Sequence, residues 1–161
     1  MRLAPLLRLP PAALGILREV GRHLLRRPVV GFALAARVPD GRWLLIRRAD
    51  TGTWALVGGT LEWGETLREA IPRELMEEAG ARVRSIGRLV GVFSHPDRDI
   101  RFHAVTVVVA CDVELPSRPP MNILEITEVG LFTDAELPTE FAMGTGDMLA
   151  AARRGGEAVL E

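Results

Sequence analysis

The sequence predicts an α/β fold in which helices pack on the faces of a mixed β-sheet. Short apolar segments rich in β-branched residues alternate with helical segments, and several strand segments follow one another through turn residues. Strands that are joined by tight turns pair antiparallel, which argues against a doubly wound parallel sheet. The length of 161 residues fits one domain whose core is large enough to need no disulfide.

Turns and loops separate the first three predicted strands. Residues 29–38 are apolar, a Pro-Asp-Gly turn follows at residues 39–41, and residues 43–47 return as a second strand, which predicts a β-hairpin. A further loop at residues 50–52 leads to a short strand at residues 54–57, which runs into two glycines.

Helical periodicity begins after these glycines. A helix is expected at residues 66–79, and Gly80 supplies its C-terminal stop. The remaining strands are expected at residues 83–93, 102–113 and 129–132. A last helix is expected at residues 147–154, before another pair of glycines.

Residues 1–28 differ from the domain predicted at residues 29–161, because they combine regularly spaced arginines with an apolar stripe. The arginines are Arg18, Arg22 and Arg26, and the stripe contains Leu14, Leu17 and Leu24. This spacing predicts a basic amphipathic helix. We expect it to pack against its own domain or against a second copy in a homodimer, with a membrane surface as the alternative.

Composition narrows the classes of function. A net charge of −1 gives the whole chain no electrostatic attraction to nucleic acid, and no nucleic-acid partner is expected. All 20 basic residues are Arg, so neither a lysine Schiff base nor a P-loop lysine is available. The single cysteine, Cys111, cannot form an internal disulfide, which predicts a reducing, cytoplasmic setting. No apolar run reaches the ~18 residues of a membrane-spanning helix.

Acidic residues crowd the predicted helix at residues 66–79. Glu74, Glu77 and Glu78 fall on adjacent turns of one face, where like charges repel. A solvated acidic surface is the simple explanation for such a run. A bound divalent cation is the alternative, because Mg²⁺ takes carboxylate oxygens and removes the repulsion. The glycines of the preceding loop let the backbone approach a ligand.

The surrounding residues favour the cation, because they match the Nudix box, G-x5-E-x7-R-E-U-x-E-E-x-G-U, where U is a bulky apolar residue. The matching positions are Gly59, Glu65, Arg73, Glu74, Leu75, Glu77, Glu78 and Gly80. The chain therefore resembles the Nudix hydrolase family over residues 29–138. Three positions depart from the pattern: Ala81 is small, Val57 replaces a common proline, and Pro72 lies inside the predicted helix.

The resemblance implies a Nudix-like α/β/α sandwich and a hydrolase that needs Mg²⁺ or Mn²⁺. Its metal ligands are expected at Glu74, Glu77, Glu78 and the carbonyl of Gly58, with Arg73 as the orienting residue. The general base is either a box glutamate, Glu77 or Glu78, or a carboxylate on a later loop. The later candidates are Glu125 and, second, Glu128.

Substrate contacts are expected outside the box. Arg48 suits a phosphate, or else lies on a strand surface. Arg98 belongs to residues 91–101, which resemble the small ADP-ribose pyrophosphatase-like branch of the family. Phe93 is proposed to contact the substrate by stacking on a base, and Phe102 is considered for the same role, although both residue positions also suit a strand core.

Three functions remain in competition. The first is a pyrophosphohydrolase that cleaves a small nucleoside diphosphate derivative, with ADP-ribose or an NDP-sugar as the first expectation. The second is a (d)NTP pyrophosphohydrolase that sanitises the nucleotide pool. The third is a non-catalytic domain that senses ADP-ribose, which the complete set of box acids argues against.

Overall fold

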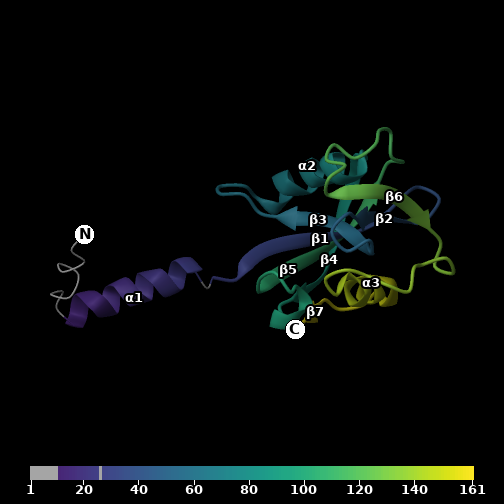
Figure 1. Cartoon of the computed structure of the whole chain (residues 1–161). Helices are drawn as coiled ribbons and strands as arrows, with labels where there is room; N and C mark the ends of the chain where they lie inside the picture. Colours follow the sequence, from purple (N-terminus) through teal and green to yellow (C-terminus); the bar gives the residue numbers. More distant parts are fainter. Residues whose placement is uncertain (1–10, 26) are drawn as a thin grey trace.

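Strands and helices alternate along the chain in the computed structural model, which describes residues 11–25 and 27–161 (Figure 1). The helices are α1 (Pro11–Leu25), α2 (Leu67–Ala79) and α3 (Thr145–Arg154), with a 3₁₀ turn, η2 (Pro96–Arg98). The strands are β1 (Val29–Arg37), β2 (Trp43–Arg48), β3 (Trp54–Thr60), β4 (Val83–Phe93), β5 (Ala104–Val113), β6 (Ile126–Phe132) and β7 (Val159–Leu160). The predicted helix at residues 66–79 and the predicted strand at residues 83–93 are confirmed, whereas η2 and β7 were not predicted.

The strands form one mixed sheet in the order β6-β2-β3-β1-β5-β4-β7. β1 pairs parallel with β5, and β4 pairs parallel with β7, while the other main pairs are antiparallel. A mixed sheet was predicted, and this topology confirms it. The described strands do not form a doubly wound parallel sheet.

The predicted hairpin between β1 and β2 is mostly replaced by another pairing. The two strands pair only where Arg37 faces Trp43, and β3 takes the place beside β1. β1 is antiparallel to both β2 and β3, which are antiparallel to each other. Three such strands cannot lie flat side by side, because two of them would then be parallel. The sheet therefore bends at β3, which pairs with β2 through residues 54–56 and with β1 through residues 57–60.

Each face of the sheet has its own core, as the period-2 alternation of a strand requires. Leu34 on β1 packs under α2 with Leu75, whereas its neighbour Ala35 packs on the other face with Leu149 of α3. Helices thus cover both faces of the sheet, and the predicted α/β/α sandwich is confirmed (Figure 1).

Helix α2 has clear signals at both ends. Thr66 is the N-cap, and the Glu69 carboxylate accepts hydrogen bonds from the Thr66 backbone N–H (2.9 Å) and hydroxyl (2.7 Å). Gly80 ends the helix with a φ of 60°, a conformation that costs glycine little. The helix continues through Pro72, which is exposed, so the helix does not begin late at this residue.

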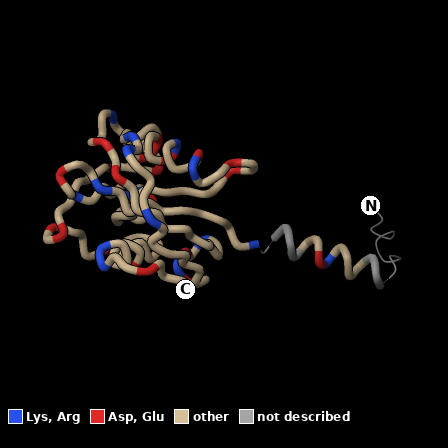
Figure 2. The backbone as a smooth tube through the Cα atoms, turned by 180° about the vertical axis from the view of Figure 1, so that it is seen from behind, with Lys and Arg blue, Asp and Glu red and all other residues tan. Residues whose placement is uncertain are grey.

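Helix α1 projects away from the sheet (Figures 1 and 2). Leu14, Leu17 and Val20 are exposed on it, so α1 does not dock on its own domain in this structure. The predicted Arg22, Leu24 and Arg26 lie outside the part of the chain whose side chains are described. Among the described residues, no helix has the length and apolarity to cross a bilayer.

Candidate active site

Helix α2 presents its acidic residues at the bend in the sheet. Its apolar side is buried against β3 and its neighbours, with Ile71, Leu75 and Ala79 in the core. Each residue of a helix points about 100° from the one before it, so two residues four positions apart point in nearly the same direction. Glu74 and Glu78 therefore lie on the same flank of α2, beside its buried side. The packing of α2 therefore directs both carboxylates toward the backbone of β3.

Two consecutive glycines of β3 receive these carboxylates. The Gly58 backbone N–H donates to Oε2 of Glu78 at 3.0 Å. A Cβ atom on Gly59 would lie 2.2 Å from Oε1 of Glu74, and one on Gly58 would lie 2.1 Å from the backbone oxygen of Phe32. Only glycine leaves enough room for the close approach of β1 on one side and of Glu74 on the other.

Arg73 holds three carboxylates together. Its guanidinium donates to both Glu65 oxygens, at 2.8 and 2.9 Å, and to Glu74 at 3.0 Å. It also reaches Glu77 at 3.5 Å. A bidentate Arg–carboxylate pair sets the orientation of both side chains as well as neutralising their charges. Arg73 therefore connects Glu65, in the loop before α2, to the helix. These contacts place Arg73 beside the carboxylates, and its orienting role in the reaction stays a prediction.

Burial changes the acidity of the two inward glutamates. Burial raises the pKa of Glu78 to about 8. The negative charges of Glu74 and Glu125 add to this increase, whereas the Gly58 N–H and the more distant Arg48 oppose it. Burial also raises the pKa of Glu74, against the opposing effect of Arg73. The folded chain thus holds two adjacent carboxyl groups in an environment that disfavours their charge.

A cavity of about 420 Å³ opens at these groups. Six of the predicted site residues line it: Gly58, Glu74, Glu78, Arg48, Arg98 and Glu125. They come from β2, β3, α2, η2 and the loop before β6. The bend of the sheet therefore brings together residues that are far apart in the sequence.

Glu77 does not join Glu74 and Glu78 in the cavity. Its side chain is 46% exposed and pairs with Arg73 on the outer side of α2. Among the described residues, no group of three or more acidic, His or Cys side chains is arranged to hold a metal ion. Glu74, Glu77 and Glu78 are therefore not gathered in one cavity here, because Glu77 and Glu78 diverge around the helix, and their roles as metal ligands stay predictions.

Arg48 and Glu125 meet near the end of β2. The guanidinium of Arg48 pairs with Asp50 at 2.9 and 2.7 Å, and its side chain is largely buried at the cavity. The Ala49 N–H donates to the Glu125 backbone oxygen at 2.8 Å. Glu128, the second candidate for a base, pairs instead with Arg47 at 3.5 Å and does not line the cavity.

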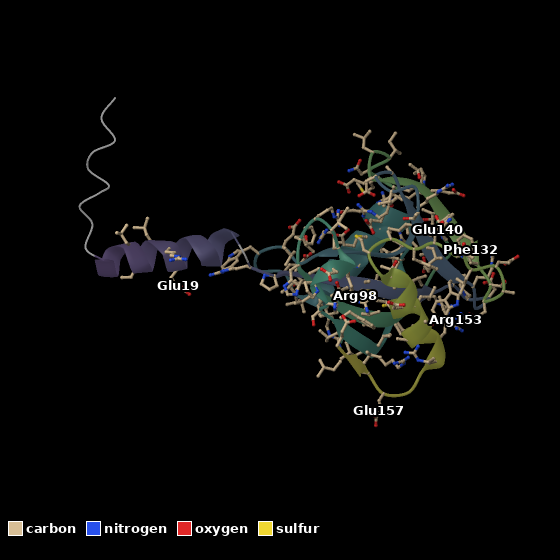
Figure 3. All side chains as sticks on the ribbon, turned by 60° about the horizontal axis from the view of Figure 1, so that its bottom comes forward. Glu19, Arg98, Phe132, Glu140, Arg153 and Glu157 are labelled. Atoms are coloured by element: carbon tan, nitrogen blue, oxygen red, sulfur yellow. The ribbon has the colours of Figure 1, made fainter. Side chains whose placement is uncertain are left out.

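Phe93 does not line the cavity, whereas Arg98 lines it but is bonded to other residues of the chain. Phe93 is 4% exposed in the core on the α3 face, and the Arg98 guanidinium lies 5.3 Å from the centre of its ring. Arg98 lies beside α3 (Figure 3). It lines the cavity, but it donates to Glu161, Asp147 and the Gly144 backbone oxygen. These contacts commit most of its donors to the protein itself.

Sequence reasoning missed several residues of the cavity wall. They are Asp99, Arg101, Met143 and Thr145. The alternation of acidic and basic residues in the loop at residues 97–101 was a signal of paired charges there. No local signal marked Met143, because its position depends on the contact between the loop before α3 and β3.

Relatives of known description share parts of this sequence. The ADP-ribose pyrophosphatase of Methanocaldococcus jannaschii is 44% identical over 77 residues, which cover 46% of this chain and 45% of that protein. A MutT-like protein of Streptomyces ambofaciens is 51% identical over 61 residues, which cover 38% of this chain and 39% of that protein. The matches therefore span less than half the length of these relatives.

Solved structures match over more of the chain. The MutT NUDIX hydrolase of Burkholderia pseudomallei has a TM-score of 0.68 and 30% identity, over 78% of this chain and 98% of that one. The NUDIX domain of Shewanella oneidensis NrtR, in complex with ADP ribose, has a TM-score of 0.65 at 19% identity, over 96% of this chain and 98% of that one, and shows the shared fold.

The family model of the NUDIX domain matches residues 26–152, which include α2, the two glycines of β3 and every cavity residue named above. This match extends over far more than half of the chain. The chain therefore belongs to the Nudix hydrolase family.

Proposed function

We propose that this chain is a divalent-cation-dependent pyrophosphohydrolase that cleaves the diphosphate of ADP-ribose or a related NDP-sugar. The observation that carries the proposal is the pair Glu74 and Glu78, which lie against Gly58 and Gly59 in a cavity that Arg48 also lines. The two carboxylates offer oxygen donors to a metal ion, and the Arg48 guanidinium offers a positive charge to a phosphate in the same cavity.

The donor set fits Mg²⁺ or Mn²⁺. Two partly buried carboxyl groups with raised pKa values gain most from a neighbouring positive charge, and hard cations prefer carboxylate and carbonyl oxygens. Glu74, Glu78 and the Gly58 carbonyl would hold the ion, with Glu77 held outside by Arg73. When bound, the ion supplies charge neutralisation for the diphosphate and a more acidic water.

The chain's own residues have separate tasks in the hydrolysis. Arg48 lies where it can pair with a phosphate oxygen, and Arg73 keeps Glu74 in place. A water oxygen forms a bond to one phosphorus while the bond from that phosphorus to the bridging oxygen breaks. Glu125 is exposed at the same cavity and is our candidate to accept the water proton, with a box glutamate as the alternative.

The choice of ADP-ribose rests on similarity. The 44% identical relative is described as an ADP-ribose pyrophosphatase, and the Shewanella neighbour was solved with ADP ribose. A (d)NTP pyrophosphohydrolase is the second candidate, because the 51% identical relative is described as MutT-like. The paired glutamates in the cavity favour hydrolysis over a purely ligand-sensing role.

A substrate panel tests the proposal. Phosphate products should be measured from ADP-ribose, NDP-sugars, dinucleotides and (d)NTPs, each with Mg²⁺, with Mn²⁺ and after EDTA treatment. We expect turnover of ADP-ribose or an NDP-sugar that stops with EDTA and returns with added cation. Full turnover after EDTA would overturn the cation dependence, and pyrophosphate release from (d)NTPs alone would favour the second candidate.

We also propose a cytoplasmic location and a homodimer. The support for the first is the single cysteine, Cys111, which is buried and whose thiol has a pKa that burial raises to about 11. The support for the second is the exposed apolar stripe of α1.

A further inference from the structure

The Glu161 side chain, which follows β7, binds the loop after β4. Its carboxylate accepts from the backbone N–H groups of Ser94 and His95, each at 2.8 Å. It also accepts from Nε of Arg98 at 3.0 Å and from Nη2 of the same side chain. These donors, with Arg98 the strongest, lower the pKa of Glu161 to about 2, so the carboxylate is charged at neutral pH. Residues 94–98 are thus fastened to the C-terminal side of β7 by a charged group.

Arg98, which lies beside α3 (Figure 3), continues this connection to the start of that helix. Its Nη1 donates to the Gly144 backbone oxygen at 3.3 Å and to the Asp147 carboxylate at 3.1 Å. A Cβ atom on Gly144, the N-cap of α3, would lie 2.4 Å from this nitrogen, so a larger residue there would displace Arg98. We define Glu161, Arg98 and Asp147 as the Glu161 clamp.

The Glu161 clamp joins two segments of the cavity wall that are far apart in the sequence. The first is the loop at residues 94–101, and the second is the segment that leads into α3 at residues 141–147. Besides Arg98, the cavity residues of these segments are Asp99, Arg101, Met143 and Thr145. β5 and β6 lie between the two segments in the chain, so the position of one segment against the other depends on contacts such as the bonds of Arg98.

The backbone of the second segment is strained beside the clamp. Met143 has a φ of 52°, which residues other than glycine rarely adopt. Its neighbours are bound on both sides, because the Ala142 N–H donates to the Trp54 oxygen at 2.8 Å and the Gly144 oxygen accepts from Arg98. A strained conformation persists where the surrounding structure enforces it. Loss of the Arg98 contact therefore removes part of what keeps Met143 at the cavity.

We propose that Glu161 is a positioning residue for the cavity, because through Arg98 it holds residues 94–101 and 141–147 in place as two parts of the wall. The clamp acts on the shape of the wall, whereas hydrolysis is proposed at the inward glutamates of α2. The inference therefore rests on the proposed function for its kinetic effect, which should fall on substrate binding and not on the chemical step. The coupling of the two segments to each other needs no substrate.

Hydrogen exchange followed by mass spectrometry on the full-length protein tests this coupling directly. Glu161→Gln keeps the shape of the side chain and removes the charge with which Arg98 pairs. We expect amide exchange to become roughly tenfold faster in residues 94–101 and also in residues 141–147, because both segments open more easily without the charge-assisted bonds. Exchange in α2 should not change.

Glu157→Gln is the matched control. Glu157 is exposed on the turn between α3 and β7 (Figure 3), and its substitution removes the same charge from the same part of the chain. This variant should exchange as the unmodified protein does. Faster exchange of Glu161→Gln in residues 94–101 alone, or no change in either segment, would overturn the inference, because residues 141–147 would then not depend on Glu161.

Steady-state kinetics on the diphosphate that the substrate panel identifies supply a second readout. Glu161→Gln and Arg98→Gln should each raise KM roughly fivefold with little change in kcat. The double variant should raise KM little further, because the two residues act as one unit. Glu161→Asp, which keeps the charge, should recover part of the loss. A role in fold stability alone would lower the melting temperature and leave both constants unchanged.

The outcomes separate this inference from the proposed function. If no diphosphate of the panel is hydrolysed while both segments exchange faster in Glu161→Gln, the hydrolytic proposal fails and the coupling by Glu161 is supported. If ADP-ribose is hydrolysed and Glu161→Gln leaves its KM unchanged, the positioning role fails and the hydrolytic proposal is retained. A lower KM would also overturn the positioning role, because Glu161 would then be withholding Arg98 from the substrate.

Discussion

At the scale of single residues, the two inward glutamates show how packing prepares a site at a cost in stability. Leu75 anchors α2 in the core, and the same turn of helix carries Glu74 and Glu78 to the backbone of β3. One N–H, from Gly58, compensates Glu78 only in part, so its carboxyl has a pKa of about 8. A cation at this place would relieve an unfavourable arrangement that folding alone does not reward.

The first prediction concerns Glu78→Gln. We expect phosphate release to fall at least roughly 100-fold, because the amide keeps the shape and removes the charge that a cation needs. Without metal, the stability contributed by the raised pKa of Glu78 is fully present below its ordinary value near 4.5 and is lost as the pH rises through about 8. The variant has no such loss.

Thermal melting in EDTA verifies this pH dependence. The melting temperatures of the two proteins should be similar near pH 5, and the variant should be the more stable by on the order of 1 kcal/mol or more above pH 8. Full activity of the variant, or inactivity that comes only from unfolding, would count against Glu78 as a metal ligand.

A second prediction separates the two candidate bases on the later loop and strand. Glu125 lines the cavity, and its charge raises the pKa of Glu78, whereas Glu128 pairs with Arg47 away from the cavity. We expect Glu125→Gln to lower kcat roughly 100-fold or more with little change in KM, and Glu128→Gln to leave both constants unchanged. Steady-state kinetics on ADP-ribose would show the difference. Equal, negligible effects of both substitutions would leave the base among the box glutamates.

At the scale of elements, α2 contains a proline that lowers the free energy of unfolding. Pro72 lies in the helix interior, where it removes one backbone hydrogen bond to Arg68 and crowds the preceding turn. Its ring is exposed, so a smaller side chain would lose no core packing. We expect Pro72→Ala to raise the free energy of unfolding by roughly 1–3 kcal/mol while turnover is retained. Thermal melting and phosphate release measure the two effects, and a lower melting temperature would show that α2 needs the proline for its present course.

Local signals predicted the elements better than their partners. Residues 83–93 and the helix that ends at Gly80 follow from apolar patterning and a C-cap, which act within a few residues. The pairing of most of β1 with β3, and of only its last residue with β2, depends on the bend in β3, which is a tertiary feature. Likewise, β7 has only two residues, and its pairing with β4 gives no periodic signal.

Among the site residues, too, some positions could be predicted from local sequence and others could not. The positions of Glu74, Glu78 and Arg73 follow from one helix and its spacing, so a sequence motif was enough to predict them. The turn of Glu77 toward solvent, by contrast, follows from the position of α2 on the sheet. Arg101 and Met143 meet across a gap of 42 residues, which no spacing rule within one element can connect.

At the scale of the whole molecule, the domain and its N-terminal helix differ in the surfaces that they expose. Acidic and basic residues are interspersed along the backbone of the domain (Figure 2), which agrees with a small-molecule substrate. Helix α1 instead exposes an apolar stripe away from the body, with Leu14, Leu17 and Val20 uncovered. We propose that residues 1–28 form an interaction segment and that the stripe is buried against a second copy of the chain.

The last prediction tests this dimer. Fully burying a leucine side chain is worth roughly 1.5–3 kcal/mol, so Leu14 and Leu17 from each copy would stabilise an interface appreciably. Deleting residues 1–27 should convert a dimer to a monomer in light scattering and lower the melting temperature, while cleavage at the Glu74 and Glu78 site continues in part. Full-length Leu17→Glu should have the same effect on mass because it places a charge in the stripe, whereas Arg18→Gln should not.

A membrane surface would use the same helix differently. Its arginines would require anionic lipid, and binding would weaken as salt is added, whereas a leucine interface would be nearly insensitive to salt. Sedimentation with anionic liposomes at low and high salt therefore distinguishes the two. If the full-length and truncated proteins have one mass and one melting temperature, and only the full-length protein pellets with the liposomes, α1 binds lipid and not a second copy of the chain.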